Sequence, residues 1–213
     1  MKRFPTLLAL PLFLFTLLCA APVSAEETAA SASDASSIVK DFYTTLQSTM
    51  KDGPALGFDG RYKKLEPAVT KAFNLPLMTR YAVGLAWSKA SADEQAKLVK
   101  AFSNFSVATY ASRFTKSDGE VFEVLGEKPA AGGGVMVETR LTPKDSDPVT
   151  LNYLVRKDET GALRIVDVYL DAAISELATR RAEFGSVVKR EGLPALLASL
   201  IEKAKKMGLS ISG

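Results

Sequence analysis

The sequence predicts an α+β domain, in which helices come before and after a four-stranded antiparallel meander. Between residues 38 and 116, apolar residues recur every three or four positions, as they do in amphipathic helices. Four runs between residues 120 and 170 are instead rich in β-branched and aromatic residues, and turn-forming segments separate them. Helical spacing then returns and continues almost to the C-terminus.

The first 25 residues have the layout of a secretory signal peptide, with cleavage expected after Ala25. Lys2 and Arg3 precede an apolar run over residues 7–18, and small residues stand at positions 23–25. The run is shorter than the roughly 20 residues that a membrane-spanning helix needs, so we expect secretion rather than a permanent anchor. Residues 26–37, EETAASASDASS, are small and polar and should form a flexible linker.

The composition excludes several classes of protein. The chain has no histidine, and its only cysteine, Cys19, belongs to the expected signal peptide. Histidine-based triads, cysteine–histidine dyads and nearly all zinc sites are therefore excluded, and we expect no cofactor. The 27 basic and 24 acidic residues almost balance, so no overall positive field favours nucleic acid as a partner.

Two helical segments are expected at the start of a single domain that spans residues 38–208. Residues 38–50 carry apolar side chains at helical spacing, and Gly53-Pro54 should end that helix. Residues 59–73 show the same spacing, but Pro67 lies inside the segment and should break it.

A short helix from Asn74 should end at Gly84, with Trp87 in the turn beyond. A long helix is then expected from Ala92 to about Lys116, because Ser91 and the glutamate three positions later form a capping-box pattern. The apolar stripe of this helix is too wide for a two-helix seam, so it should face a sheet.

The four strands are expected over residues 120–126, 135–142, 149–156 and 163–170. The segments between them, AAGGG, PKDSDP and KDETG, are rich in turn-forming residues. Connections this short join antiparallel neighbours, which predicts a meander. Two helices, residues 174–191 and 193–207, should close the chain, divided at Gly192.

Large aromatic side chains on several elements should converge on this sheet. They either fill a solid core or line a cavity, and composition and periodicity do not distinguish the two; these residues are Phe73, Trp87, Phe102, Phe105, Tyr110, Phe114 and Tyr153. The best carboxylate pair for an enzyme of the glycosidase kind is Asp167 with Asp171. Both are expected instead to serve in turns or caps, so we expect no enzyme.

Several stretches together resemble the MlaC family of secreted lipid-binding proteins, also called toluene-tolerance auxiliary proteins. They are FNLPLMTRYAVGLAW (residues 73–87), the helix with Tyr110 and Phe114, and RIVDVYLDAAISELATRRAEF (residues 164–184). In the last stretch a strand leads to Ser175, Arg181 and Phe184 at the family's spacing. The run ISELATRR is most similar to the hopanoid-associated HpnM branch.

The resemblance implies a twisted sheet and helices that enclose an apolar pocket for acyl chains, in a periplasmic shuttle for phospholipid or a hopanoid-type lipid. The implied partners are an inner-membrane ABC transporter with MCE domains and an outer-membrane lipoprotein complex, with transient membrane contact. The side chains expected to contact lipid are Phe73, Trp87, Phe102, Phe105, Tyr110, Phe114, Val137, Leu141, Tyr153, Val155, Val168, Ile174, Ser175, Leu177, Arg181 and Phe184.

Arg180 and Arg181 point about 100° apart on a helix, and we expect Arg181 to lie at the pocket rim and pair with a lipid phosphate. Alternatively, Arg181 pairs with Asp171 or Glu183 and only fixes the helix. Two further readings of the chain stay open. One is a secreted adaptor with a solid core that docks through its basic C-terminal helices; the other is a lipid-modifying enzyme that relies on carboxylates.

Overall fold

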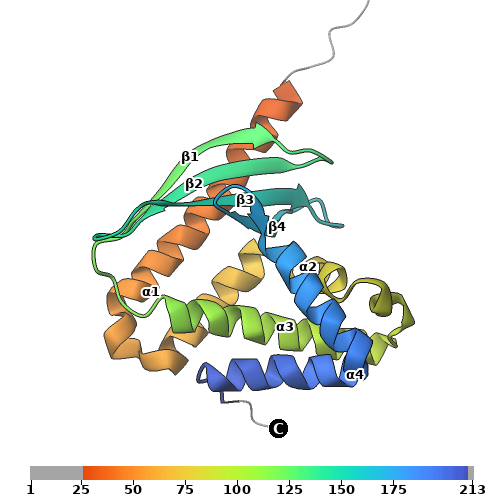
Figure 1. Cartoon of the computed structure of the whole chain (residues 1–213). Coiled ribbons are helices and arrows are strands. Elements are labelled where there is room, and N and C mark those ends of the chain that lie inside the picture. The colour runs from red at the N-terminus through yellow and green to blue at the C-terminus, as the bar shows by residue number, and fades with distance from the viewer. Residues whose placement is uncertain (1–25, 211–213) are drawn as a thin grey trace, which may run out of the picture.

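The computed structural model describes residues 26–210, with side chains from Ala35 onward. Helices and a five-stranded antiparallel sheet make up this part of the chain, so the predicted α+β class is confirmed (Figure 1). The expected signal peptide, residues 1–25, lies outside the described residues. Within residues 26–210, no helix is both long enough and apolar enough to cross a membrane.

Helix α1 (Glu26–Ala72) is continuous except for a kink at Gly57, where φ is 61°. The break expected at Gly53-Pro54 thus comes four residues later, at a second glycine that adopts the left-handed conformation. Gly53 has a different role, since a Cβ there would lie 2.1 Å from the carbonyl oxygen of Thr115. The break expected at Pro67 is absent, since α1 continues through this residue to Ala72 although proline has no backbone N–H to donate within the helix.

The stretch expected as a linker, residues 26–37, is part of α1. Alanine recurs in this stretch and has the highest helix propensity. Ala35 is also fully buried in the core. Small size and low hydrophobicity, which suggested a linker, are therefore compatible with a packed helix here.

Helix α2 (Leu75–Val83) begins where the Asn74 side chain accepts a hydrogen bond from the Leu77 backbone N–H, and it ends at Gly84. The 3-10 helix η1 (Gly84–Lys89) contains Trp87. Helix α3 (Ala92–Arg113) starts with the predicted capping box. It ends at Arg113, about one turn earlier than expected.

The sheet is the predicted meander with one strand more, in the order β1-β2-β3-β4-β5. A tight hairpin with positive φ at Asp171 and Ala172 returns the chain after β4 and forms the short β5. Two residues show no periodicity, which is why the sequence did not reveal this strand. The strands are β1 (Val121–Pro129), β2 (Val135–Thr142), β3 (Val149–Lys157), β4 (Leu163–Leu170) and β5 (Ile174–Ser175).

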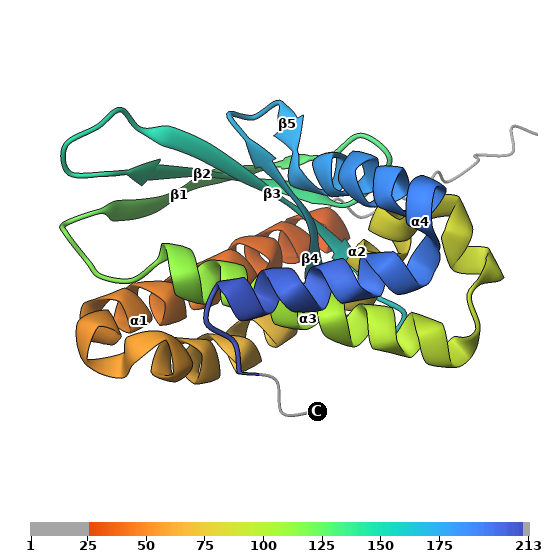
Figure 2. The same ribbon diagram turned by 60° about the horizontal axis from the view of Figure 1, so that its bottom comes forward.

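Helix α4 (Glu176–Lys206) is divided at Gly192, where φ is 84°, as the sequence predicted. Helix α1 packs against β1, β2 and β4, whereas α3 packs mainly against α1, α2 and α4 (Figure 2). The end of α1 is tied to the sheet, because the Asn74 backbone N–H donates to the Ile165 carbonyl oxygen of β4 at 2.9 Å. Helix α3 therefore faces the sheet across a space that the other helices close at the sides.

Candidate functional site

A cavity of about 220 Å³ occupies the space between α3 and the sheet. Every long helix and three of the strands contribute to its wall. Most of the lining is apolar or aromatic: Leu46, Val69, Phe73, Leu75, Met78, Phe102, Phe105, Tyr110, Phe114, Phe122, Leu151, Tyr153, Val168, Leu170 and Leu177. The described side chains thus enclose an apolar space rather than a completely filled core.

The aromatic rings of the wall pack against one another, which keeps them from collapsing into the cavity. The Tyr110 ring stacks on Phe114 with centroids 5.9 Å apart, and Phe114 in turn meets Phe122 of β1. Phe42, behind the wall, makes edge contacts with Phe73 at 5.3 Å and with Tyr110 at 5.1 Å. Such contacts are geometrically specific and stabilise a fixed arrangement of rings.

The charged side chains of the lining are Arg113, Glu176 and Arg180, and the first of these ends α3 while the other two begin α4. Arg180 donates to Glu183 at 3.0 Å and lies 3.7 Å from Glu176. Its guanidinium also lies over the Phe105 ring. Arg113 is exposed and, among the described residues, forms no ion pair. Arg113 therefore carries the one charge of the lining that no described carboxylate pairs with.

The Glu183 carboxylate accepts hydrogen bonds from two cations, Lys203 and Arg180. Burial alone would raise the pKa of this carboxyl, but the hydrogen bonds from the two cations hold the pKa below its ordinary value. Glu183 is therefore ionised near neutral pH and engages Arg180. Arg113 remains the freer of the two cavity arginines.

A buried carboxylate fixes the start of α4 against the sheet. Asp167 of β4 accepts hydrogen bonds from the Ser175 hydroxyl at 2.6 Å, the Leu177 backbone N–H at 3.0 Å and the Val168 backbone N–H at 2.8 Å. The Ser175 hydroxyl oxygen in turn accepts from the Ala178 N–H, as an N-cap. These contacts place the first turn of α4, with its cavity-lining residues, at the end of β4.

The family model described as "MlaC protein" matches residues 40–202, which is most of the chain. The chain belongs to the MlaC family. The resemblance found in the sequence is confirmed, while the narrower assignment to the HpnM branch stays a prediction. Among curated proteins, none matches the chain.

One solved structure with a similar fold is the phospholipid-binding protein from Ralstonia solanacearum, determined in complex with a phospholipid. The two structures superpose with a TM-score of 0.70 at 20% sequence identity, over 84% of this chain and 99% of the other. At this identity the similarity establishes the shared fold. The MlaC-family architecture seen here thus extends over the whole of that protein.

Half of the side chains predicted to contact lipid line the cavity. They come from the residue after α1, from α3 and its cap, from β3 and β4, and from the start of α4; they are Phe73, Phe102, Phe105, Tyr110, Phe114, Tyr153, Val168 and Leu177. Their contact with lipid stays a prediction.

The other predicted side chains lie elsewhere in the fold. Val137 and Val155 are fully buried within the sheet layer, and the Phe184 ring packs on Phe102 behind the cavity wall. Trp87, in η1, is half-buried. The remaining four are off the cavity as well: Leu141 on β2, Ile174 on β5 with about half its surface exposed, Ser175 as the α4 cap, and Arg181.

The structure places Arg180, not Arg181, at the cavity. Arg181 is exposed and turns toward the end of α2, where its guanidinium lies 3.4 Å from the Tyr81 carbonyl oxygen and packs on Gly84. Neither expected carboxylate, Asp171 nor Glu183, pairs with it among the described residues; Glu183 pairs with Arg180 instead. Helical spacing alone does not separate the two arginines, because they stand three and four positions after Leu177 on one face of α4. The contact of Leu177 with Asp167, which seats α4 on β4, is what brings Arg180 rather than Arg181 to the cavity.

The carboxylate pair considered for catalysis does not form a site. Asp167 is buried and its oxygens are occupied by three donors, whereas Asp171 is exposed in the β4–β5 hairpin. In residues 26–210, no group of acidic, histidine or cysteine side chains is arranged to hold a metal ion. These aspartates act in a cap and a turn, as the sequence indicated.

Several lining residues were missed by the sequence analysis. Phe122 and Leu151 lie on the same face of the sheet as Tyr153, and strict alternation along β1 and β3 would have found them. Leu75 and Met78 share the inner face of α2 at i, i+3 spacing. No sequence pattern marked Arg113 as a lining residue, because the helix was expected to continue to about Lys116, whereas α3 ends at Arg113.

A second cavity, of about 460 Å³, lies at the β1–β2 hairpin. Its wall contains the glycines of that hairpin, Gly132, Gly133 and Gly134, and few large apolar side chains. It is larger than the aromatic cavity but lacks aromatic lining. The 220 Å³ cavity, called the aromatic cavity below, is therefore the candidate ligand site.

The tyrosines of the core predict a loss of stability in alkali. Burial raises the pKa of Tyr43, Tyr110, Tyr153 and Tyr169 above the ordinary value of 10.0, and raises that of Tyr62 to about 12. The unfolded chain releases these protons first, so the stabilisation is complete below pH 10 and is lost as pH rises toward 12. Urea unfolding at increasing pH should show this decline, and Tyr62→Phe should make it shallower. A constant free energy of unfolding across that range would contradict the prediction.

Proposed function

We propose that this protein binds phospholipid in the aromatic cavity and carries it between the two membranes of the bacterial envelope. The observation that carries the proposal is an apolar cavity with a charged end, in a member of the MlaC family. The phospholipid bound by the Ralstonia solanacearum protein of the same fold supports the choice of ligand. Acyl chains would occupy the aromatic wall, and the head group would lie at Arg113.

The energetics suit a passive carrier. Burying a methylene contributes roughly 0.8 kcal/mol, so a 16-carbon chain gains on the order of 12 kcal/mol when it leaves water for a dry cavity. A bilayer shelters the chain about as well, so exchange between carrier and membrane is nearly balanced. Contact with a partner then sets the direction of transfer, and no chemical step is required.

The size of the cavity implies that the walls move when lipid enters. Its 220 Å³ lies below the usual ligand-pocket range of about 300–1,000 Å³. Two acyl chains therefore need the sheet and α3 to separate further. That movement would part the aromatic contact between the end of α3 and β1, in which the Phe114 and Phe122 ring centroids lie 6.3 Å apart.

The proposal includes a periplasmic location, supported by the signal-peptide pattern of the first 25 residues. It also includes exchange with an inner-membrane MCE-domain transporter and an outer-membrane lipoprotein complex, as family membership suggests. A hopanoid-type lipid remains the alternative ligand for the same cavity. The expected role is a carrier and not an enzyme.

The competing model, an adaptor with a solid core and a basic C-terminal face, has less support. The adaptor model requires a solid core, whereas the described side chains enclose a cavity. Several of the basic side chains on α4 are also paired with neighbouring carboxylates, which reduces the field available to an acidic partner; these pairs are Arg180–Glu183, Arg190–Glu191, Lys203–Glu183 and Lys205–Glu202.

The head-group role is tested by Arg113→Gln. Because the exposed guanidinium makes a charge-assisted contact that solvent screens, we expect affinity for a soluble short-chain phospholipid to fall about threefold to tenfold. Isothermal titration calorimetry measures this affinity. Arg181→Gln is the matched control and should bind like the unmodified protein. Equal affinity of all three proteins would remove the head-group role from Arg113, and no binding to any of them would refute the proposed function.

A further inference from the structure

We infer that the corner formed by α2 and η1 docks on the surface of an anionic lipid bilayer. This corner, called the Leu85 corner below, consists of Tyr81 and Leu85 with the cations Arg80, Lys89 and Arg181. Leu85 is 86% exposed, more than any other large apolar side chain of the described residues, and Tyr81 is 46% exposed. A single exposed apolar residue is ordinary, but two of them among unpaired cations form a surface with a defined chemistry.

The exposure of Leu85 is built into the fold. Helix α2 ends at Gly84, where φ is 70°, and this turn directs the next side chain outward. Helix η1 is then held in place, because the Gln95 side chain donates to the Trp87 carbonyl oxygen at 3.0 Å. Trp87 packs against the hydrophobic core. Leu85 therefore protrudes from an anchored element, and its side chain buries little apolar surface when the chain folds.

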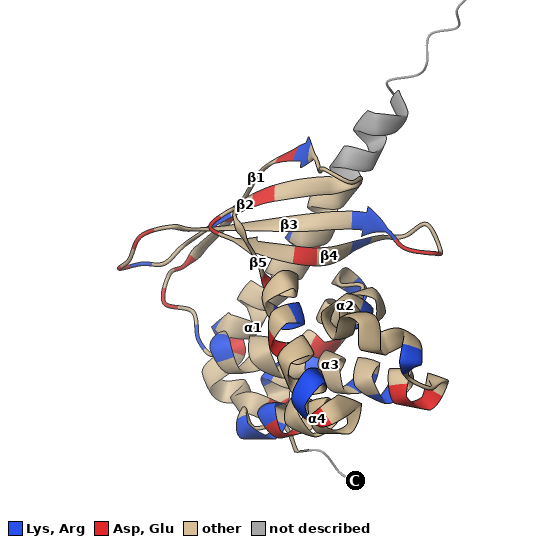
Figure 3. Ribbon diagram, turned by 45° about the vertical axis from the view of Figure 1, so that its right-hand side comes forward, with Lys and Arg blue, Asp and Glu red and all other residues tan. Residues whose placement is uncertain are grey.

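The charges of the Leu85 corner have one sign. No acidic residue occurs between Glu66 and Asp93, so none lies on α2 or η1 (Figure 3). Among the described residues, Arg80, Lys89 and Arg181 form no ion pairs. Arg181 is fixed beside Tyr81 by its contact with the Tyr81 carbonyl oxygen.

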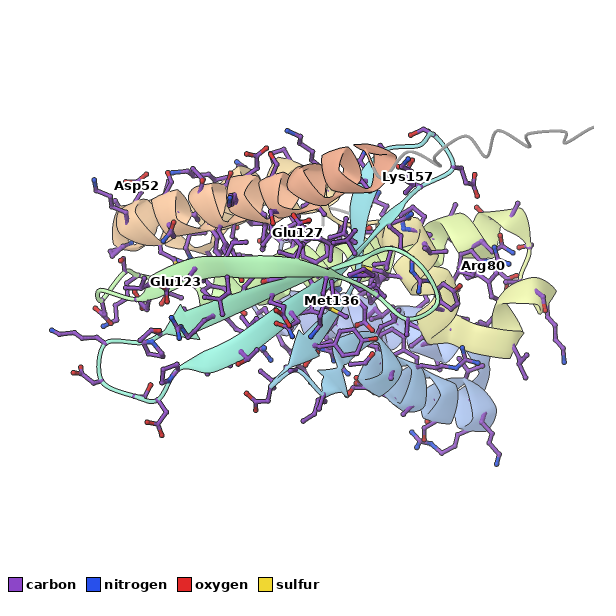
Figure 4. All side chains as sticks on the ribbon, turned by 90° about the horizontal axis from the view of Figure 1, so that it is seen from above. Asp52, Arg80, Glu123, Glu127, Met136 and Lys157 are labelled. Carbon is purple, nitrogen blue, oxygen red and sulfur yellow. The ribbon has the colours of Figure 1, made fainter. Side chains whose placement is uncertain are left out.

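The nearest acidic residues in sequence are engaged elsewhere. Asp93 pairs with Lys97 at 2.6 Å, and Glu94 accepts hydrogen bonds from Ser91 in the capping box. Arg80 lies at the end of the molecule opposite Asp52, away from Glu123 of β1 (Figure 4). The Leu85 corner thus presents three cations that form no ion pair with any carboxylate of the described residues.

This combination fits a bilayer surface. Anionic head groups attract a cluster of three cations, while leucine and the amphipathic ring of tyrosine favour the boundary between head groups and acyl chains. Two apolar side chains give only shallow insertion, so the contact is reversible, as a carrier requires. The same helix reaches the cavity, because Leu75 and Met78 line it from the opposite face of α2. Docking at this corner therefore brings the cavity wall close to the membrane.

Vesicle sedimentation tests this inference on the mature protein beginning at Glu26, with phosphatidylglycerol–phosphatidylcholine vesicles and with phosphatidylcholine vesicles alone. We expect binding to the anionic vesicles only, weakened by salt. Leu85→Ser should lower the bound fraction about threefold. Leu125→Ser is the matched control, since Leu125 is 54% exposed on β1, and it should bind like the unmodified protein.

Two results would overturn the inference: equal sedimentation with both kinds of vesicle, or the same bound fraction for Leu85→Ser and Leu125→Ser. Retention of the protein by an acidic protein surface but not by vesicles would also reject a bilayer as the occupant. Lipid content in the cavity is measured in parallel and should be unchanged by Leu85→Ser. The docking surface and the proposed lipid site therefore fail or hold independently.

Discussion

Replacing Leu151 by aspartate should remove bound lipid from the protein. Leu151 lies on β3 in the middle of the apolar wall and is only half-buried, because its side chain faces the cavity. In the empty cavity, water can solvate the new carboxylate. An acyl chain would displace that water, and neutralising the group at pH 7 costs about 4 kcal/mol, which is roughly a thousandfold in affinity.

Leu125→Asp is the control for this substitution. Leu125 is exposed on β1 and does not line the cavity, so the same chemical change should leave bound lipid unaffected. Lipid per protein, measured by native mass spectrometry, distinguishes the two variants. Similar lipid content in both folded variants would place the ligand outside the aromatic cavity.

The second large effect is expected for Asp167→Asn. The amide has one acceptor oxygen in place of a carboxylate that receives three donors, so at least one buried donor loses its partner. Hydrogen bonds to buried charged groups contribute more than neutral ones, and we expect the free energy of unfolding to fall by about 3 kcal/mol. Urea denaturation measures this change as a lower midpoint at constant slope.

Asp171→Asn provides the comparison. Asp171 is exposed in the hairpin, and asparagine tolerates its positive φ of 50°, so its effect should stay within about 0.5 kcal/mol. Because Asp167 fixes the first turn of α4, Asp167→Asn should also reduce retained lipid. If both substitutions changed stability equally, Asp167 would not fix α4 as described.

The sequence predicted long elements better than short or kinked ones. The strands of the meander and the division at Gly192 followed from periodicity and turn chemistry, which are local. The kink of α1 did not, because Gly53 and Gly57 are equally able to end a helix in isolation. Tertiary contact decides between them, since Gly53 packs against the backbone at Thr115.

The site was predictable in kind but not in detail. Aromatic residues such as Phe105 and Tyr110 could be expected near a cavity, but a filled core and a lined cavity need the same apolar faces. The choice between Arg180 and Arg181 depended on how α4 sits on β4. Asp167 sets that orientation by a contact with Leu177 that no spacing reveals.

The central claim is that the aromatic cavity holds lipid, and native mass spectrometry of the mature protein purified without detergent tests it most directly. We predict one bound phospholipid per chain, retained through purification and identified after organic extraction. A hopanoid in its place would keep the cavity assignment and change the ligand. A protein that is empty as purified, and still empty after incubation with vesicles of both lipid classes, would contradict the account.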